Sequence, residues 1–139
     1  MTTVLVFGTF DRLHPGHQSF FAQAKTLGDR LLVVVARDEV VEKYKGRHPD
    51  EPLEMRLQKV RADTHVDEAI PGDTLEGQGT YAVIEAYHPD IVALGYDQEK
   101  LSKNIQSHPL FRDRLKTVTL EPFRPDIYKS SILREKIKK

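Results

Sequence analysis

The pattern of apolar positions along the chain predicts five strands. Apolar residues form continuous runs at residues 4–7, 31–36 and 91–95. These runs are rich in β-branched residues, which is typical of strands buried on both faces of a parallel sheet. Two shorter apolar segments, at residues 66–70 and 118–120, indicate two further strands.

Segments with helical spacing lie between these strands. Apolar residues within 20–27 recur at helical intervals, and Gly28 suits the C-terminal cap of that helix. The same spacing predicts helices at residues 53–60, 83–87 and 130–137. Because strands and helices alternate, we expect an α/β fold in one domain that spans the whole chain. It would be a doubly wound, Rossmann-like parallel sheet of five strands with helices on both faces.

The predicted topology brings three loops to one place. Ligands of doubly wound sheets bind beyond the carboxyl ends of the strands, near the switch in strand order. The loops after the first, fourth and fifth predicted strands should therefore face one crevice. These loops hold residues 8–17, 95–98 and 124–131, and the residue types that suggest chemistry gather in the same segments.

The loop after the first strand combines glycines with two histidines. Gly8 and Gly16 let backbone N–H groups approach an anion, and Thr9 adds a hydroxyl. His14 and His17 fall in the first turn of the predicted helix, where both imidazoles can reach the same oxygens. The segment therefore predicts a phosphate site. A packed or capping histidine, and a zinc pair without a third ligand nearby in the sequence, are the alternative interpretations.

Four further residues outside that loop have ordinary structural interpretations when they are taken alone. Lys43 and Lys45 belong to a basic cluster after the second strand, which is typical of a solvated face. Arg56 on the predicted helix would pair with neighbours and solvent. Ser130 would cap the last predicted helix.

Composition narrows the classes of function. The 139 residues include 21 basic and 21 acidic side chains, which argues against a general nucleic-acid binder. Cysteine is absent, which excludes disulfides and thiolate zinc sites and fits a cytoplasmic protein. The longest apolar run, residues 31–36, is too short to cross a bilayer. The chain starts directly in a predicted strand, so we expect no signal peptide and no membrane partner.

The loop after the first strand also carries a family resemblance. Its sequence, Gly-Thr-Phe-Asp-x-x-His-x-Gly-His, resembles the HxGH signature of the nucleotidyltransferase superfamily, in the form typical of cytidylyltransferase-like members. Similar motifs occur at residues 27–29, 38–39, 54–56, 95–97 and 124–131, so the resemblance covers almost the whole chain. It implies in-line nucleotidyl transfer, in which a phosphate oxygen of an acceptor attacks the α-phosphorus of a nucleoside triphosphate and releases pyrophosphate.

The resemblance implies roles for individual residues. His14 and His17 would donate hydrogen bonds to the triphosphate as negative charge moves toward the leaving group. One of Lys43 and Lys45 would reach the same phosphates, and Asp11 would orient the loop rather than act as a base. The catalytic residues that it implies are His14, His17, Lys43, Lys45 and Arg124. The nucleotide-binding residues that it implies are Gly8, Thr9, Phe10, Asp11, Gly16, Arg56, Gly95, Asp97, Gln98, Ser130 and Ser131.

Cofactor, acceptor and assembly follow from the same resemblance. Mg²⁺ would accompany the triphosphate, held mainly by phosphate and water. Residues 95–98, 35–39 and 128–131 look more like archaeal-type FAD synthetases, which transfer AMP from ATP to FMN. The alternative enzyme is a CTP-dependent cytidylyltransferase acting on glycerol 3-phosphate or another small phosphate. A non-catalytic nucleotide-binding module is the third interpretation. Family members of this size commonly form homodimers, which we expect here.

Overall fold

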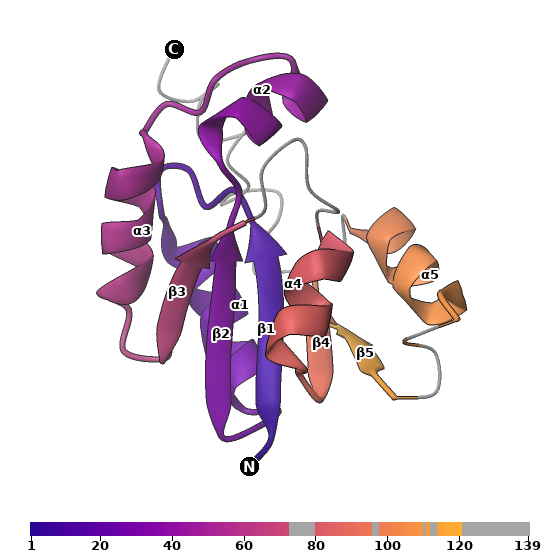
Figure 1. Cartoon of the computed structure of the whole chain (residues 1–139). Helices are drawn as coiled ribbons and strands as arrows, with labels where there is room; N and C mark the ends of the chain where they lie inside the picture. The colour runs from indigo at the N-terminus through magenta and orange to yellow at the C-terminus, as the bar shows by residue number, and fades with distance from the viewer. Residues whose placement is uncertain (73–79, 96–97, 110, 112–113, 121–139) are drawn as a thin grey trace.

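A computed structural model shows one parallel sheet with helices around it (Figure 1). The structure describes residues 1–72, 80–95, 98–109, 111 and 114–120. The strands are β1 (Thr3–Gly8), β2 (Arg30–Val35), β3 (Glu68–Pro71), β4 (Ile91–Leu94) and β5 (Lys116–Thr119). The helices are α1 (Pro15–Lys25), α2 (Asp38–Lys45), α3 (Leu53–Arg61), α4 (Thr80–Tyr87) and α5 (Glu99–Ser107).

The strand order β3-β2-β1-β4-β5 makes β1 the centre of the sheet. All pairs are parallel, and Val4 lies opposite Leu31 of β2 on one side and Ile91 of β4 on the other. The order reverses between β1 and β4, so the carboxyl ends of these two strands flank the switch point. The predicted fold class is confirmed.

Side-chain alternation along β1 divides the core into two layers. Val4 and Val6 pack in the cluster that includes residues of α1 and α3. Leu5 and Phe7 pack in the cluster that includes residues of α4 and α5. Figure 1 shows α4 in front of the sheet and α1 behind it. Because both faces of the sheet are covered at its centre, β1, β2 and β4 are continuous apolar runs rather than alternating ones.

Two of the helices, α2 and α5, were not predicted. Helix α2 buries only Val41 among its eight residues, and α5 buries only Ser102 and Ile105. The apolar residues of each helix do recur at helical spacing, but each helix has only two or three of them in eight or nine residues, so the pattern is short. The helix expected at residues 130–137 lies outside the described residues. Within the described part of the chain, no helix is both long and apolar enough to cross a membrane.

The end of α1 also differs from the expectation. The helix stops at Lys25 with Thr26 as its C-cap, so Gly28 is not the capping residue. A Cβ at Gly28 would lie 2.7 Å from the Thr2 carbonyl oxygen. That oxygen accepts hydrogen bonds from the Asp29 and Arg30 N–H groups. Glycine is therefore needed here for the close approach of two backbone segments.

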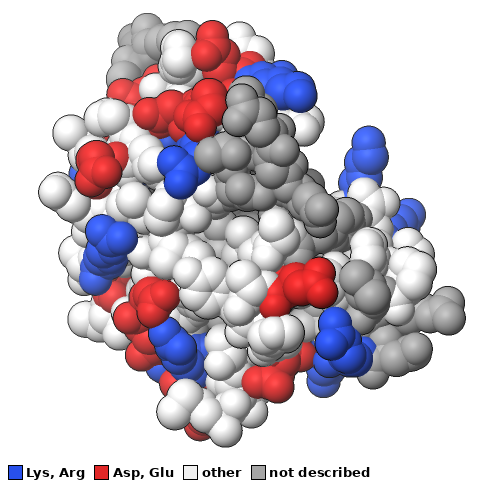
Figure 2. All heavy atoms as spheres, in the orientation of Figure 1, with Lys and Arg blue, Asp and Glu red and all other residues white. Residues whose placement is uncertain are grey.

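Acidic and basic side chains are interspersed on the face of the molecule seen in Figure 2. This distribution matches the equal numbers of basic and acidic residues in the sequence.

Candidate active site

The loop between β1 and α1 is folded tightly around the ring of Phe10. A Cβ at Gly8 would lie 2.7 Å from Phe10 Cζ, so only glycine leaves room for the ring at this position. The ring is 6% exposed and its centroid lies 5.0 Å from that of Phe21 on α1. The φ angles of Phe10 and Arg12, 52° and 53°, lie in the left-handed region that L-residues rarely adopt. Packing of Phe10 therefore holds the loop in an intrinsically unfavourable conformation.

The two histidines form the start of α1. His14 is the N-cap, and its Nδ1 accepts a hydrogen bond from the Gly16 N–H at 3.0 Å. His17 Nδ1 accepts from the His14 N–H at 3.3 Å, and Pro15 occupies the first turn, where its missing N–H costs nothing. The two rings are stacked with centroids 3.9 Å apart. Because both Nδ1 atoms accept backbone bonds, each neutral ring carries its proton on Nε2.

Burial keeps both imidazoles neutral. It lowers the pKa of His14 below the usual 6.5. Burial, followed by the proximity of His14, lowers the pKa of His17 from 6.5 to about 3. Near neutral pH the pair therefore consists of two uncharged Nε2–H donors at the N-terminus of a helix, a place that attracts anions. An uncharged donor can strengthen its bond as charge develops on a phosphate without repelling its neighbour.

Asp11 connects this loop to the segment before α3. Its carboxylate, in a residue that is 6% exposed, accepts hydrogen bonds from the N–H groups of Asp50 at 2.6 Å and Glu51 at 2.9 Å. In return, the Arg12 N–H donates to Glu51 Oε1 at 2.7 Å. With both oxygens engaged by the backbone, the Asp11 carboxylate orients the loop.

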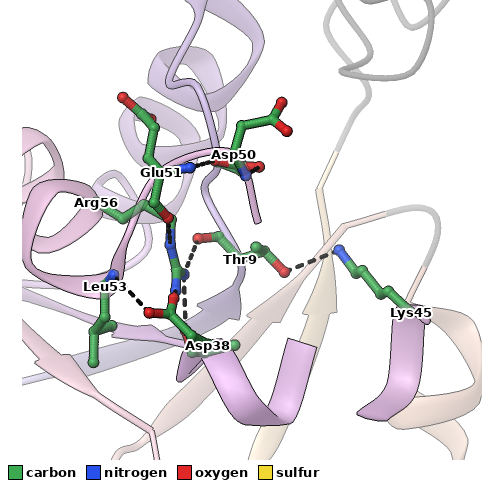
Figure 3. A network of polar contacts seen from close by, with 9 residues as sticks. Thr9, Asp38, Lys45, Asp50, Glu51, Leu53 and Arg56 are labelled. Carbon is green, nitrogen blue, oxygen red and sulfur yellow. Dashed lines mark hydrogen bonds and ion pairs between the residues drawn. The ribbon is translucent and has the colours of Figure 1, made fainter. Parts of the chain in front are cut away.

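Arg56 points from α3 toward Asp38, Glu51 and Thr9 (Figure 3). Its side chain is 0% exposed, and its Nη2 forms an ion pair with Asp38 at the start of α2. Nε donates to the Glu51 carbonyl at 3.0 Å, and Nη1 donates to the carbonyls of Thr9 at 2.8 Å and Ala36 at 2.7 Å. These four contacts engage Nε, Nη1 and Nη2 with protein groups. The nucleotide contact expected from the sequence stays a prediction.

The structure separates the two candidate lysines. Lys45, at the end of α2, donates from Nζ to Thr9 Oγ1 at 2.9 Å (Figure 3). Lys43 instead lies with its Nζ 5.5 Å from the centroid of the Tyr44 ring. Arg47 forms an ion pair with Asp50 at 3.7 Å. The structure therefore brings Lys45, but not Lys43, to the loop between β1 and α1.

Gln98 joins the ends of β1 and β4 across the switch point. Its Oε1 accepts from the Gly95 N–H at 2.9 Å, and its Nε2 donates to the Phe7 carbonyl at 3.0 Å. Both ends of the amide thus bond backbone groups at the ends of the two strands that flank the switch point. The nucleotide contact expected for this residue stays a prediction. The other predicted site residues, Asp97, Arg124, Ser130 and Ser131, lie outside the described residues.

Sequence reasoning missed Asp38 and Glu51 as parts of the site. Asp38 follows β2 directly, and Arg56 falls between the apolar positions Leu53 and Leu57 on the inner side of α3. A charged residue on the apolar side of a helix needs a buried partner. An acidic residue at the carboxyl end of the neighbouring strand was the signal that could have identified the pair.

A doubly wound sheet with a glycine turn and two neutral histidine donors at its switch point defines an α/β nucleotide-binding domain of the HxGH type. Comparison with known proteins agrees. The chain belongs to the cytidylyltransferase-like family, whose model matches residues 5–136.

Two curated relatives are both described as FAD synthase. That of Pyrococcus abyssi is 46% identical over 96 residues, which are 69% of this chain and 64% of the relative. That of Thermococcus onnurineus is 44% identical over 109 residues, or 76% of this chain and 71% of the relative. The match with the first relative thus spans less than two thirds of that protein.

Solved structures show the same fold. The crystal structure of a lipopolysaccharide core biosynthesis protein from Thermoplasma volcanium superposes with a TM-score of 0.79 at 34% identity, covering 88% of this chain and 98% of that one. A protein from Archaeoglobus fulgidus superposes with a TM-score of 0.68 at 17% identity, covering 87% of this chain and 90% of that one, which supports the fold alone.

Proposed function

We propose that this protein is a nucleotidyltransferase that joins the AMP of ATP to the phosphate of FMN and releases pyrophosphate. The observation that carries the transfer chemistry is the pair His14 and His17, whose backbone bonds set two neutral Nε2–H donors at the start of α1. The FAD synthase relatives support the choice of ATP and FMN.

The reaction needs alignment and charge stabilisation more than covalent help. A phosphate oxygen of FMN, already largely ionised at neutral pH, attacks the α-phosphorus, and the bond from that phosphorus to the bridging oxygen of pyrophosphate breaks. Charge thereby moves onto the pyrophosphate. The Nε2–H groups of His14 and His17 donate to these oxygens, and each such donor is worth about 3 kcal/mol in the transition state.

Other groups of the loop hold the phosphates before transfer. The Thr9 hydroxyl and the amides around Phe10 offer donors, and the N-terminus of α1 adds its dipole. Lys45 lies at Thr9 in the structure and would supply a positive charge to the triphosphate. We therefore assign the lysine contact to Lys45 rather than Lys43.

Mg²⁺ fits this donor set as a companion of the nucleotide. Among the described residues, no group of three or more His, Cys, Asp or Glu side chains could hold a metal ion. Both oxygens of Asp11, the buried carboxylate in the loop, accept backbone bonds. Phosphate oxygens and water would hold the ion, which would neutralise triphosphate charge when bound.

Pyrophosphate release tests the proposal. Purified protein with Mg²⁺ is given ATP or CTP, each with FMN, glycerol 3-phosphate, phosphocholine or a sugar phosphate. We expect turnover with ATP and FMN, and FAD as the product. Turnover with CTP alone would refute the choice of substrates, and tight nucleotide binding without turnover in any combination would refute the enzyme.

A matched variant tests the histidine mechanism. His14→Asn keeps an oxygen that can cap α1, since asparagine is among the best N-cap residues, but removes the Nε2–H donor. We expect kcat to fall at least about 100-fold with the unfolding midpoint nearly unchanged. An unchanged kcat would show that His14 only caps the helix.

The resemblance to cytidylyltransferase-like enzymes also supports pairing of two copies, which we include in the proposal. Sedimentation velocity on the full chain should then give twice the mass of one chain. A single monomeric boundary throughout the micromolar range would contradict pairing without touching the assignment of activity.

A further inference from the structure

The buried Arg56 has no role in the mechanism above, although burying a guanidinium is costly unless all its groups are used. The structure shows that it contacts three separate segments. These are the loop between β1 and α1 through Thr9, the β2–α2 connection through Ala36 and Asp38, and the segment before α3 through Glu51. Figure 3 shows the guanidinium between Asp38, Glu51 and Thr9.

The contact with Thr9 determines which way one peptide group points. The Thr9–Phe10 peptide is not cis, so its carbonyl and its N–H point in opposite directions. Arg56 Nη1 holds the Thr9 carbonyl at 2.8 Å. The Phe10 N–H must therefore point away from Arg56, and this amide is one of those that the proposed function assigns to phosphate.

The backbone alone would prefer the opposite orientation. Turning the Thr9–Phe10 peptide over would move the φ angle of Phe10 from its left-handed value of 52° to an ordinary negative value. The flipped peptide would aim its N–H at the guanidinium and its carbonyl oxygen away from it, toward the anion. A positive charge beneath the carbonyl opposes that flip.

The same guanidinium fixes the start of α2. It binds the Ala36 carbonyl and the Asp38 carboxylate, and Lys45 at the other end of that short helix donates to Thr9 Oγ1. Arg56 thus holds both the backbone of Thr9 and the helix whose lysine reaches the Thr9 side chain.

We propose that Arg56 is a positioning residue for the nucleotide, which holds the Thr9–Phe10 peptide with its N–H turned outward to a phosphate oxygen and fixes α2 so that Lys45 meets the same site. This role rests on the proposed nucleotidyl transfer, but it makes a claim about anion binding that can be measured without turnover.

Arg56→Lys is the test variant, because lysine keeps the positive charge but cannot reach several carbonyls at once. Arg61→Lys is the matched control. Arg61 also lies on α3 and donates to a backbone carbonyl, that of Ala69 at 2.9 Å, but at β3 and outside the proposed site. Titration calorimetry with ATP, and separately with inorganic pyrophosphate, is carried out at a temperature where circular dichroism shows all proteins to be folded.

We expect Arg56→Lys to weaken both ligands about tenfold, as loss of one well-placed donor would, and Arg61→Lys to bind as the wild type does. In turnover assays Arg56→Lys should show a raised KM for ATP. The double variant with Arg56→Lys and Arg61→Lys should show the same KM as Arg56→Lys alone. Wild-type dissociation constants in folded Arg56→Lys would overturn the proposal.

A measurement on the wild-type protein keeps the proposal testable if Arg56→Lys does not fold. The Phe10 amide resonance, followed by ¹⁵N–¹H NMR, should shift on addition of inorganic pyrophosphate. A Phe10 amide that does not respond while neighbouring amides do would overturn the proposal. Failure of pyrophosphate release from ATP with a normal Phe10 response would instead count against the proposed transfer reaction alone.

Discussion

The half-buried imidazole of His17 should make the protein sensitive to mild acid. In the unfolded chain this group titrates near its usual pKa of 6.5, whereas burial lowers its pKa in the fold to about 3. Below the unfolded value the unfolded chain binds a proton that the folded protein does not. Stability is therefore fully present above pH 6.5 and is lost as the pH falls toward 3.

The magnitude follows from the distance between the two pKa values. Each pH unit within this window costs about 1.4 kcal/mol, so lowering the pH to about 5 removes about 2 kcal/mol of unfolding free energy through His17 alone. That is a large part of the stability of a typical domain.

His17→Gln isolates the contribution. Glutamine at the third helical position can still accept from the His14 N–H, as it does in a capping box, but it does not titrate. Urea unfolding followed by circular dichroism, at constant ionic strength between about pH 7.5 and 5, should show the wild type losing about 2 kcal/mol more than the variant. Parallel pH profiles for the two proteins would refute the assignment of a half-buried, neutral His17.

Three further experiments test the site. Gly8→Ala places a methyl group against the Phe10 ring and should lower the unfolding free energy in urea by about 1–3 kcal/mol, whereas an unchanged midpoint would mean that the ring moves freely. Lys45→Met should raise the KM for ATP about tenfold in a pyrophosphate-release assay, and Lys43→Met should leave it unchanged. A raised KM in Lys43→Met but not in Lys45→Met would contradict the assignment. Gln98→Met keeps the size of the side chain but removes both backbone bonds, so calorimetry should show weaker ATP binding than in the wild type; equal affinity would show that the bridge is dispensable.

The sheet could be predicted because burial of its central strands appears in the sequence as short runs of apolar residues. Strands β1, β2 and β4 are covered on both faces and therefore consist of consecutive apolar residues. Helices α2 and α5 could not be predicted in the same way. They lie mostly at the surface and bury one and two side chains, so each offers only two or three apolar residues at helical spacing, too few to stand out among its polar residues.

The residues of the site also differ in how far away in the sequence their partners lie. The two histidines bond backbone groups only two or three residues away, so the local motif is enough to predict their arrangement. Arg56 acts on Thr9, 47 positions earlier, and on Asp38, 18 positions earlier. No local pattern shows which carbonyls a helix will meet once the sheet has formed.

These contacts determine how the described part of the site attracts an anion. His14 and His17 are uncharged near neutral pH, because burial lowers the pKa of each, and Arg56 is balanced by Asp38. In the proposed reaction the loop would therefore act through oriented dipoles, namely imidazole N–H groups, backbone amides and the start of α1, with Lys45 as the charged group beside Thr9. Dipoles fixed by the fold need no reorganisation when charge moves from the α-phosphorus to pyrophosphate, and salt screens them less than it screens exposed charges. A site built in this way favours the redistribution of charge during transfer more than tight binding of the triphosphate in its ground state.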